Sequence, residues 1–209
     1  MKNFIKNNKE YVKSISLVLI IQAIVYFIIN LSLTKYHFLD TNLNVPFIKY
    51  FIYIYHSWYP FVFFLSYLIF KDNKDVYKKL IYTLAFGFIL SNLTFIIYPS
   101  AIIRPTFEVK SITDWVVNLT YKLDNPTNCL PSEHCLVCFI LIYYLNKTNI
   151  KPLTKILSTS YLILIILSTL FTKQHLPIDV IFAFIYSTLI ILIVKQFYPK
   201  LKETLNFLF

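Results

Sequence analysis

Two histidines stand close to prolines at the starts of apolar stretches, and an acidic residue accompanies each of them. In NCLPSEHCLVCFILIYYL (residues 128–145), Ser132, Glu133 and His134 follow Pro131. Proline is favoured at the first position of a helix, so we expect these three residues to lie at a helix N-terminus. The unpaired amides of such an end bind anions, phosphate above all. A plain helix cap with an exposed histidine is the alternative, and this stretch alone favours neither.

The stretch KQHLPIDV (residues 173–180) has the same arrangement. Pro177 is expected to begin a helix with Asp179 in its first turn, and His175 precedes Asp179 by four residues. A carboxylate at this spacing can accept a hydrogen bond from one ring nitrogen and leave the other free as a nucleophile or base. The alternative is a histidine and an aspartate that only cap a helix. Lys173 adds a cation beside them.

A third element is YPSAIIRPTF (residues 98–107), in which Pro105 stiffens the backbone beside Arg104. The planar guanidinium of Arg104 can grip two phosphate oxygens, although a single arginine is more often a charge that faces lipid headgroups. Cations, a nucleophile and an acid together are what phosphoryl transfer requires. No cluster of carboxylates indicates a metal site, so we expect neither a metal nor another cofactor.

The composition excludes an ordinary soluble protein. Of 209 residues, 57% are hydrophobic and 14% are charged, against about 25% charged in typical soluble domains. No linker, composition break or repeat divides the chain, which predicts a single integral membrane domain over residues 1–209. The net charge of +10 comes from basic residues that flank apolar segments. We therefore expect membrane lipids and a lipid phosphate substrate as partners, and no nucleic acid. The oligomeric state stays open.

The apolar stretches predict an all-α bundle of six transmembrane helices. Each stretch is long enough to cross about 30 Å of hydrocarbon, and each must form a helix because its backbone finds no water there. Their approximate ranges are 14–34, 47–70, 79–98, 129–145, 152–172 and 177–198.

The distribution of lysine and arginine predicts the orientation. The N-terminal segment (Lys2, Lys6, Lys9 and Lys13), the connections near 71–79 and 147–155, and the C-terminus hold 14 of these residues, against 6 on the other side. Basic residues favour the cytoplasmic side, so both termini are expected there. The protein is then a multi-pass protein of the cell membrane, with the segment 99–128 and both histidines on the extracytoplasmic face.

The long segment 99–128 contains an apolar pattern at helical spacing behind Ser111 and Asp114, formed by Ile112, Trp115, Val116 and Leu119. Serine followed by an acidic residue three positions later is a helix-capping pattern. We expect a short helix that anchors at the membrane surface, with direct substrate contact as the alternative.

His56 lies within the second predicted span. Ionisable residues inside a membrane are functional candidates by default. Tyr55, Ser57 and Tyr59 are near enough to pair with it, so we favour a hydrogen-bonded structural role.

These motifs resemble those of the type 2 phosphatidic acid phosphatase superfamily, which includes vanadium haloperoxidases and, more distantly, sphingomyelin and inositol phosphorylceramide synthases. The family motifs are Lys-x6-Arg-Pro, Pro-Ser-Gly-His and Ser-Arg-x5-His-x3-Asp, on a six-helix core. The matching segments here are Arg104-Pro105, Pro131 to His134, and Ser168 through His175 to Asp179. The resemblance covers about residues 79–198.

The resemblance implies a metal-independent enzyme that hydrolyses phosphomonoester or pyrophosphate groups of lipid phosphates. It implies that His175 attacks phosphorus to form a phosphohistidine, with Asp179 orienting it. His134 would protonate the departing alkoxide. Arg104, Ser132 and the amides near Glu133 would hold the phosphoryl oxygens.

The chain departs from the family pattern at three positions. Ile97 replaces the lysine of the first motif, Glu133 the glycine of the second and Thr169 the arginine of the third. Lys173 is the candidate substitute for one missing cation, in a KQH pattern similar to the ceramide-headgroup transferases. Glu133 is expected either to pair with Arg104 or Lys173, or to bind the hydroxyl of an acceptor alcohol. A lipid headgroup phosphotransferase and a non-catalytic lipid-phosphate binder are therefore the alternatives to a phosphatase.

Overall fold

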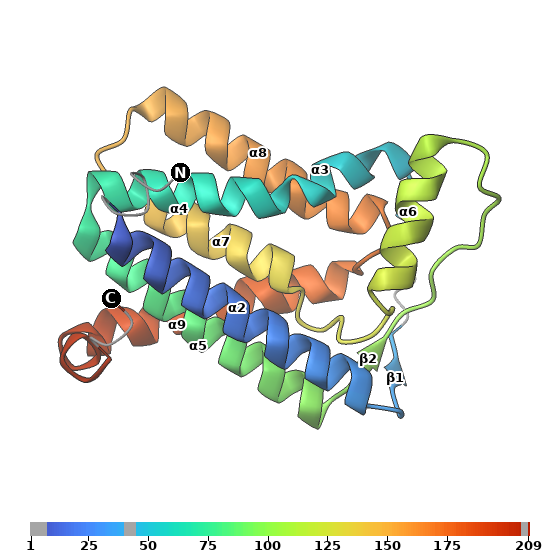
Figure 1. Ribbon diagram of the computed structural model, residues 1–209, viewed down its shortest axis with the longest axis horizontal. Helices are drawn as coiled ribbons and strands as arrows, with labels where there is room; N and C mark the ends of the chain where they lie inside the picture. The colour runs from blue at the N-terminus through green and yellow to red at the C-terminus, as the bar shows by residue number, and fades with distance from the viewer. Residues whose placement is uncertain (1–7, 40–44, 206–208) are drawn as a thin grey trace.

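The structure is a computed structural model that describes residues 8–39, 45–205 and 209, and it is a bundle of helices with one two-stranded sheet (Figure 1). Lys2 and Lys6, which enter the predicted orientation, lie outside the described residues. The elements in chain order are α2 (Lys9–Ser32), β1 (His37–Phe38), η1 (Lys49–Phe51), α3 (Ile52–His56), α4 (Trp58–Asp72), α5 (Lys74–Ile97), β2 (Ser100–Ala101), α6 (Ile112–Leu123), α7 (Glu133–Asn146), α8 (Pro152–Phe171) and α9 (Pro177–Thr204).

Four helices of the described chain, α2, α5, α8 and α9, are long and apolar enough to cross a membrane. They indicate a membrane protein. The predicted fourth span corresponds to the shorter apolar helix α7, and the second corresponds to the η1–α3–α4 segment. The prediction of six complete spans with cytoplasmic termini stays a prediction.

The predicted second span is not one continuous helix, because it breaks at Ser57 between α3 and α4. Pro60 explains the break. A proline within a helix has no amide hydrogen, and its ring clashes with the carbonyl four residues earlier, which here belongs to His56. The amide of Ser57 stays paired across the break, since it donates to the carbonyls of Tyr53 and Ile54 at 3.1 and 3.2 Å.

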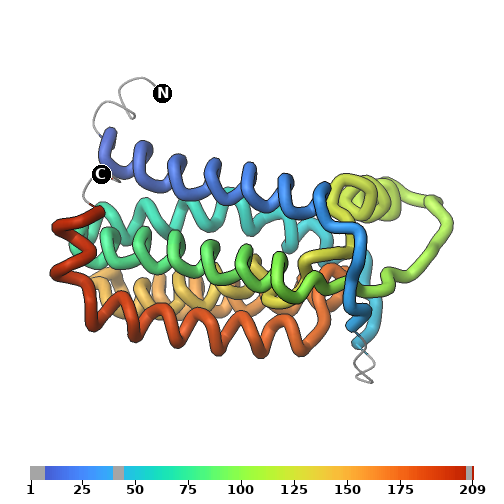
Figure 2. The backbone as a smooth tube through the Cα atoms, turned by 90° about the horizontal axis from the view of Figure 1, so that it is seen from below, coloured from blue at the N-terminus to red at the C-terminus, as the bar shows by residue number. Residues whose placement is uncertain are grey.

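Helix α7 lies at the centre of the bundle and packs against α4, α5, α8 and α9 (Figures 1 and 2). It is apolar around most of its circumference, which is typical of a buried helix. Gly87, the only glycine of the chain, lets α5 approach it closely, because a Cβ atom there would lie 3.0 Å from a methyl group of Leu136. The core thereby holds the N-terminus of α7 in a fixed place.

One end of the bundle carries the sheet and α6. Figure 2 looks along the axis of α6, which runs across the long axis of the bundle. β1 pairs in parallel with β2, and Ala101 bridges to Thr127. The Ser100 hydroxyl accepts hydrogen bonds from the amides of Cys129 and Leu130 at 3.0 and 2.9 Å. The sheet therefore fixes the segment that leads into α7.

The expected helix behind Ser111 is confirmed as α6. The Ser111 hydroxyl accepts a hydrogen bond from the Asp114 amide at 3.2 Å, and the Asp114 carboxylate accepts from the Lys110 amide and the Ser111 hydroxyl. The ammonium of Lys49, on η1, lies 2.7 Å from the same carboxylate. This ion pair connects α6 to the bundle.

We expect Asp114→Asn to lower the melting temperature in detergent at pH 7 by about 2 °C, since a single ion pair near the surface contributes little. The hydrogen bonds from Lys49 and Ser111 lower the pKa of Asp114 to about 2, below the value of about 3.9 in an unfolded chain. A lowered folded-state pKa stabilises the fold above the unfolded value, and this contribution is lost as the pH falls through the folded value. The difference between wild type and variant should therefore shrink between about pH 4 and pH 2. A difference that does not change with pH would contradict this account.

Candidate active site

The two histidines singled out by the motifs lie together at the end of the bundle that carries α6. His134 is the second residue of α7, His175 lies in the turn between α8 and α9, and their ring centroids are 6.2 Å apart. The backbone amide of Ser132 donates to the carbonyl of Asp179 at 3.2 Å, which brings the starts of α7 and α9 side by side. One small ligand can contact both rings.

The helix starts are as expected for α9 and shifted for α7. Pro177 begins α9 and Asp179 is its third residue. The expectation that Ser132, Glu133 and His134 lie at a helix N-terminus is confirmed for α7, but α7 begins at Glu133 with Ser132 as its cap rather than at Pro131. The physical reason is that the Ser132 hydroxyl accepts the hydrogen bond of the Cys135 amide at 3.3 Å, and serine is among the favoured capping residues.

The surroundings of His175 determine which of its nitrogens carries the proton. Its Nδ1 atom lies 3.2 Å from the carbonyl oxygen of Cys129 and 3.4 Å from Oδ2 of Asp179. Both neighbours only accept hydrogen bonds, so in the neutral ring Nδ1 carries the hydrogen and Nε2 has the free electron pair. Asp179 is fully buried and also accepts the Leu176 amide at 2.8 Å. Asp179 thus lies beside the His175 ring, although the closer partner of the ring is the Cys129 carbonyl.

His134 is held by aromatic rings. It stacks on Tyr55 at 4.6 Å and 29°, and Trp58 lies against it at 4.6 Å. The indole nitrogen of Trp58 donates to the backbone carbonyl of His134 at 3.2 Å. The Nε2 atom of His134 is buried without a hydrogen-bond partner among the described residues. The ring is therefore fixed in place while one nitrogen stays available.

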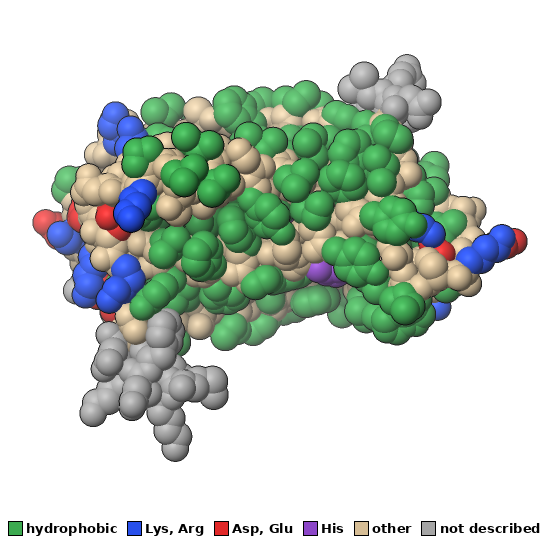
Figure 3. Space-filling model, turned by 90° about the horizontal axis from the view of Figure 1, so that it is seen from above, with side chains coloured by type: hydrophobic (Ala, Val, Ile, Leu, Met, Phe, Trp, Pro, Cys, Tyr) green, Lys and Arg blue, Asp and Glu red, His purple; other side chains and the backbone are tan. Residues whose placement is uncertain are grey.

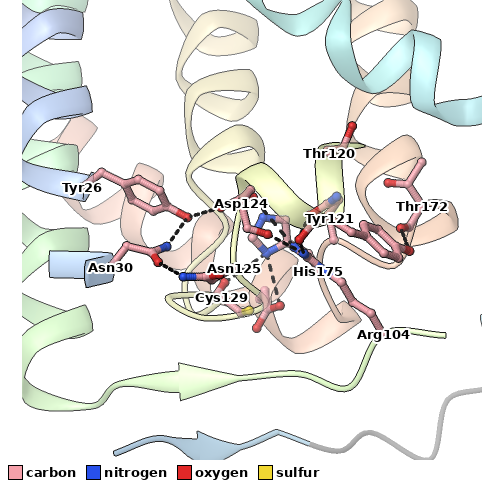
Figure 4. A network of polar contacts seen from close by, with 12 residues as sticks. Tyr26, Asn30, Arg104, Thr120, Tyr121, Asp124, Asn125, Cys129, Thr172 and His175 are labelled. Atoms are coloured by element: carbon pink, nitrogen blue, oxygen red, sulfur yellow. Dashed lines mark hydrogen bonds and ion pairs between the residues drawn. The ribbon is translucent and has the colours of Figure 1, made fainter. Parts of the chain in front are cut away.

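Arg104 lies in a polar network that Figure 4 shows between α2 and the turn of His175. Its Nη1 donates to the Asp124 carbonyl at 2.5 Å, its Nη2 donates to the side-chain oxygen of Gln174, and the Asp124 carboxylate is 3.8 Å away. The guanidinium lies over the ring of Tyr121, with its central carbon 4.6 Å from the ring centroid. Burial raises the pKa of Tyr121 to about 12, so its hydroxyl keeps its hydrogen and donates to the Thr172 carbonyl at 2.7 Å. Arg104 is therefore held firmly.

Glu133 is paired with a neutral amide. Its Oε1 accepts a hydrogen bond from Gln22 at 2.6 Å, and Asn92 donates to Gln22 at 2.7 Å. The expected pairing of Glu133 with Arg104 or Lys173 is not present among the described contacts. Lys173, whose φ is 54°, donates from its ammonium to the carbonyl of Val45.

His56 is hydrogen-bonded, as expected, but its partner is not one of its neighbours in sequence. Its Nε2 lies 2.8 Å from the hydroxyl of Thr120 on α6. This contact links α3 to α6.

A cavity of about 720 Å³ is lined by both histidines, Arg104 and Glu133. The residues that line its polar end are Gln22, Arg104, Asp124, Asn128, Glu133, His134, Gln174 and His175, whereas its walls include Leu19, Ile20, Ala23, Phe27, Val62, Phe63, Phe88, Leu119 and Leu123. Ser132, Lys173 and Asp179 are not among the lining residues. A cavity with one polar end and apolar walls suits an amphipathic molecule.

Several residues of the site were not predicted. Asp124 and Gln174 hold Arg104, and Gln22 and Asn92 hold Glu133. A glutamine or an asparagine within an apolar span was the available signal, because polar side chains in a membrane need partners.

Among the described residues, no group of three or more histidine, cysteine, aspartate or glutamate side chains is placed to hold a metal ion. Cys129, Cys135 and Cys138 are buried and free.

The family of the chain follows from comparison with known proteins. Neither the search of curated proteins nor that of solved structures gives a match. A family model described as the PAP2 superfamily matches residues 77–203, more than half of the chain, and this stretch contains Arg104, His134, His175 and Asp179. The chain therefore belongs to the PAP2 superfamily, whose members are generally phosphatases or phosphotransferases.

Proposed function

We propose that this protein is a membrane enzyme that cleaves a phosphate ester of an amphipathic lipid through a phosphohistidine on His175. One observation carries the proposal. His175 has its free electron pair on Nε2, and its ring centroid lies 6.2 Å from that of His134 at the polar end of a cavity with apolar walls. The family membership supports the same class of chemistry.

In the first step, Nε2 of His175 forms a bond to phosphorus while the bond between phosphorus and the lipid oxygen breaks. The electron pair of the broken bond goes to that oxygen, and His134 supplies the proton that completes the alcohol. The negative phosphoryl group beside His134 favours its protonated form. In the second step, water or another alcohol attacks phosphorus, the bond to His175 breaks, and His134 recovers a proton.

Arg104 is the cation that we assign to the phosphoryl oxygens, because it lines the cavity and its Nε atom is buried without a partner among the described residues. Ser132 acts through its cap at the start of α7, where the amides of the first turn stabilise negative charge. Lys173 is engaged with Val45, so we give it no contact with the substrate.

The orientation also belongs to the proposal. Figure 3 shows lysine and arginine side chains at both ends of the bundle, with more of them at the end opposite α6. Basic residues favour the cytoplasmic side. This pattern supports an active site on the extracytoplasmic face, reached by the substrate from the bilayer.

Transfer of the phosphoryl group to an alcohol is the second candidate, and Glu133 favours it. Its carboxyl group lines the cavity next to His134 and is held by the neutral Gln22. The carboxyl group in this place can form a hydrogen bond with the hydroxyl of an acceptor. Water would then not be the only group that discharges the phosphohistidine.

The test is a panel of lipid phosphomonoesters, pyrophosphates and phosphodiesters, incubated with the purified protein in detergent and EDTA. We expect turnover that persists in EDTA and is inhibited by vanadate, which mimics the five-coordinate phosphoryl group. Inorganic phosphate as the product of a monoester indicates hydrolysis, whereas a new phosphodiester lipid indicates transfer. A folded protein that binds these lipids but turns over none of them would be a binder and would contradict the proposal.

A further inference from the structure

Besides Nε2 of His134 and the hydroxyl of Thr127, three buried side chains that line the cavity have hydrogen-bonding atoms without a partner among the described residues. They are Nε of Arg104, Nε2 of Gln174, and both side-chain atoms of Asn128. Gln174 and Asn128 are each only 2% exposed, and all three residues line the cavity. Buried polar groups are almost always hydrogen-bonded, so three such residues in one place indicate a ligand with several acceptor oxygens.

Gln174 is oriented by Arg104. Its side-chain oxygen accepts a hydrogen bond from Nη2 of Arg104. Because the oxygen and nitrogen of an amide group lie on opposite sides, this contact leaves the NH₂ group of Gln174 free to donate to another acceptor. Gln174 also immediately precedes His175, so its backbone moves with the nucleophile.

The backbone of Asn128 is fixed by the sheet. Its φ is 55°, a left-handed conformation that asparagine tolerates, and its backbone amide donates to the Ser100 carbonyl at 2.8 Å. The next residue, Cys129, supplies the carbonyl that accepts the Nδ1 hydrogen of His175. Figure 4 shows Cys129, Arg104 and His175 converging at this end of the site.

The charges around the cavity favour a ligand with little negative charge. Of the described residues that line it, Arg104 is the one lysine or arginine, whereas Asp124 and Glu133 are carboxylic acids. Ile97 and Thr169 occupy the two positions where the family motifs have further cations. A doubly charged phosphomonoester would therefore meet a single fixed cation, which already lies 3.8 Å from the Asp124 carboxylate, in a medium of low dielectric constant.

We propose that the side-chain amides of Gln174 and Asn128, together with Arg104, hold the phosphoryl oxygens, and that the site takes a singly charged phosphodiester lipid in preference to a doubly charged phosphomonoester. Neutral amides donate hydrogen bonds to an anion without adding charge. This inference rests on the proposed function and specifies its substrate class. During the reaction one ester bond to phosphorus breaks as described above, whereas the other ester bond is kept on the phosphohistidine and then in the product, because the acceptor displaces only His175.

The first experiment compares two lipids with the same acyl chains, dioleoyl phosphatidylglycerol as the diester and dioleoyl phosphatidic acid as the monoester, at pH 7.5 in mixed micelles. The wild-type protein is expected to show a kcat/KM for the diester at least about tenfold higher, as a difference of one charge at short range allows. Equal or faster turnover of phosphatidic acid would overturn the charge preference while leaving the proposed function intact.

The second experiment uses Gln174→Glu, which keeps an oxygen for Arg104 and replaces the donating NH₂ group by an acceptor. We expect kcat/KM for the diester to fall by about 100-fold, because an unpaired and repelled buried oxygen weakens phosphoryl binding. Asn128→Asp should give a loss of the same order. Asn146→Asp is the matched control, since this exposed asparagine lies at the opposite end of α7.

Vanadate provides a readout that does not depend on turnover. It should raise the melting temperature of the wild type and of Asn146→Asp, but not that of Gln174→Glu. If Gln174→Glu and Asn128→Asp keep wild-type turnover and the wild-type response to vanadate, the amides do not hold the phosphoryl group. Absence of turnover in the wild type would instead count against the proposed function, and the vanadate shifts would still test the amides.

Discussion

His175→Ala is expected to reduce turnover of every lipid phosphate by at least about 10⁴-fold, as removal of a covalent nucleophile does in other enzymes. The reason is geometric. The Cys129 carbonyl and Asp179 hold the hydrogen on Nδ1 and leave Nε2 as the nucleophile, and alanine offers no atom in its place. The variant should still fold, with a lowered melting temperature, because the His175 side chain is only 11% exposed and its contacts with the Cys129 carbonyl and Asp179 are lost.

The measurement pairs steady-state turnover with trapping of the phosphoenzyme. Wild-type protein quenched during turnover of a ³²P-labelled lipid should carry an acid-labile label, and His175→Ala should carry none. His37→Ala is the control, since His37 lies on β1, where it stacks on Tyr98, and does not line the cavity. Wild-type activity in His175→Ala would show that another group attacks phosphorus.

His134→Asn is expected to lower turnover of lipids with an alcohol leaving group by about 10²- to 10⁴-fold, the usual contribution of a general acid. A nitrophenyl ester needs no proton to depart, so its first step should slow by less than about tenfold. His134 also assists the second step, and the phosphohistidine should therefore accumulate in the variant when the nitrophenyl ester is used.

The dependence on the leaving group separates an acid from a structural residue. Stopped-flow release of nitrophenol, compared with turnover of the lipid, gives the two rates. Trp58→Phe is a control, because it keeps an aromatic ring beside His134 and removes the indole nitrogen that donates to the His134 carbonyl. An equal loss for both leaving groups in His134→Asn would assign His134 a role in packing alone.

The helices of the bundle follow from the sequence because long apolar runs leave few alternatives in a membrane. The start of α7 was placed two residues too early, since the preference of proline for the first helical position competes with the capping hydroxyl of Ser132. The break at Ser57 was missed, although Pro60 carries the signal. Local rules conflict in both cases, and the surrounding packing decides between them.

The candidate site was predictable only in part. His134, at the start of α7, and His175, in the turn before α9, come together at one end of the bundle, as the motifs predict. The partners of Arg104 and Glu133 were not predictable, because they depend on how the helices are rotated and on the path of the segment before α7. Gln22 and Glu133 are 111 positions apart, and a periodic apolar pattern does not specify which polar groups of two spans will face each other.

Helix α2 has a consequence for how this site can change over time. It lies before the stretch of residues 77–203 that the family model matches, yet Gln22 contacts Glu133, Tyr26 donates to Asp124, and Asn30 accepts from Asn125. His134 and His175 thus belong to the stretch that the family model matches, whereas one wall of the cavity comes from a separate helix. Under the proposed function, exchange or mutation of that helix changes which lipids fit the cavity and leaves the proposed reacting groups in place.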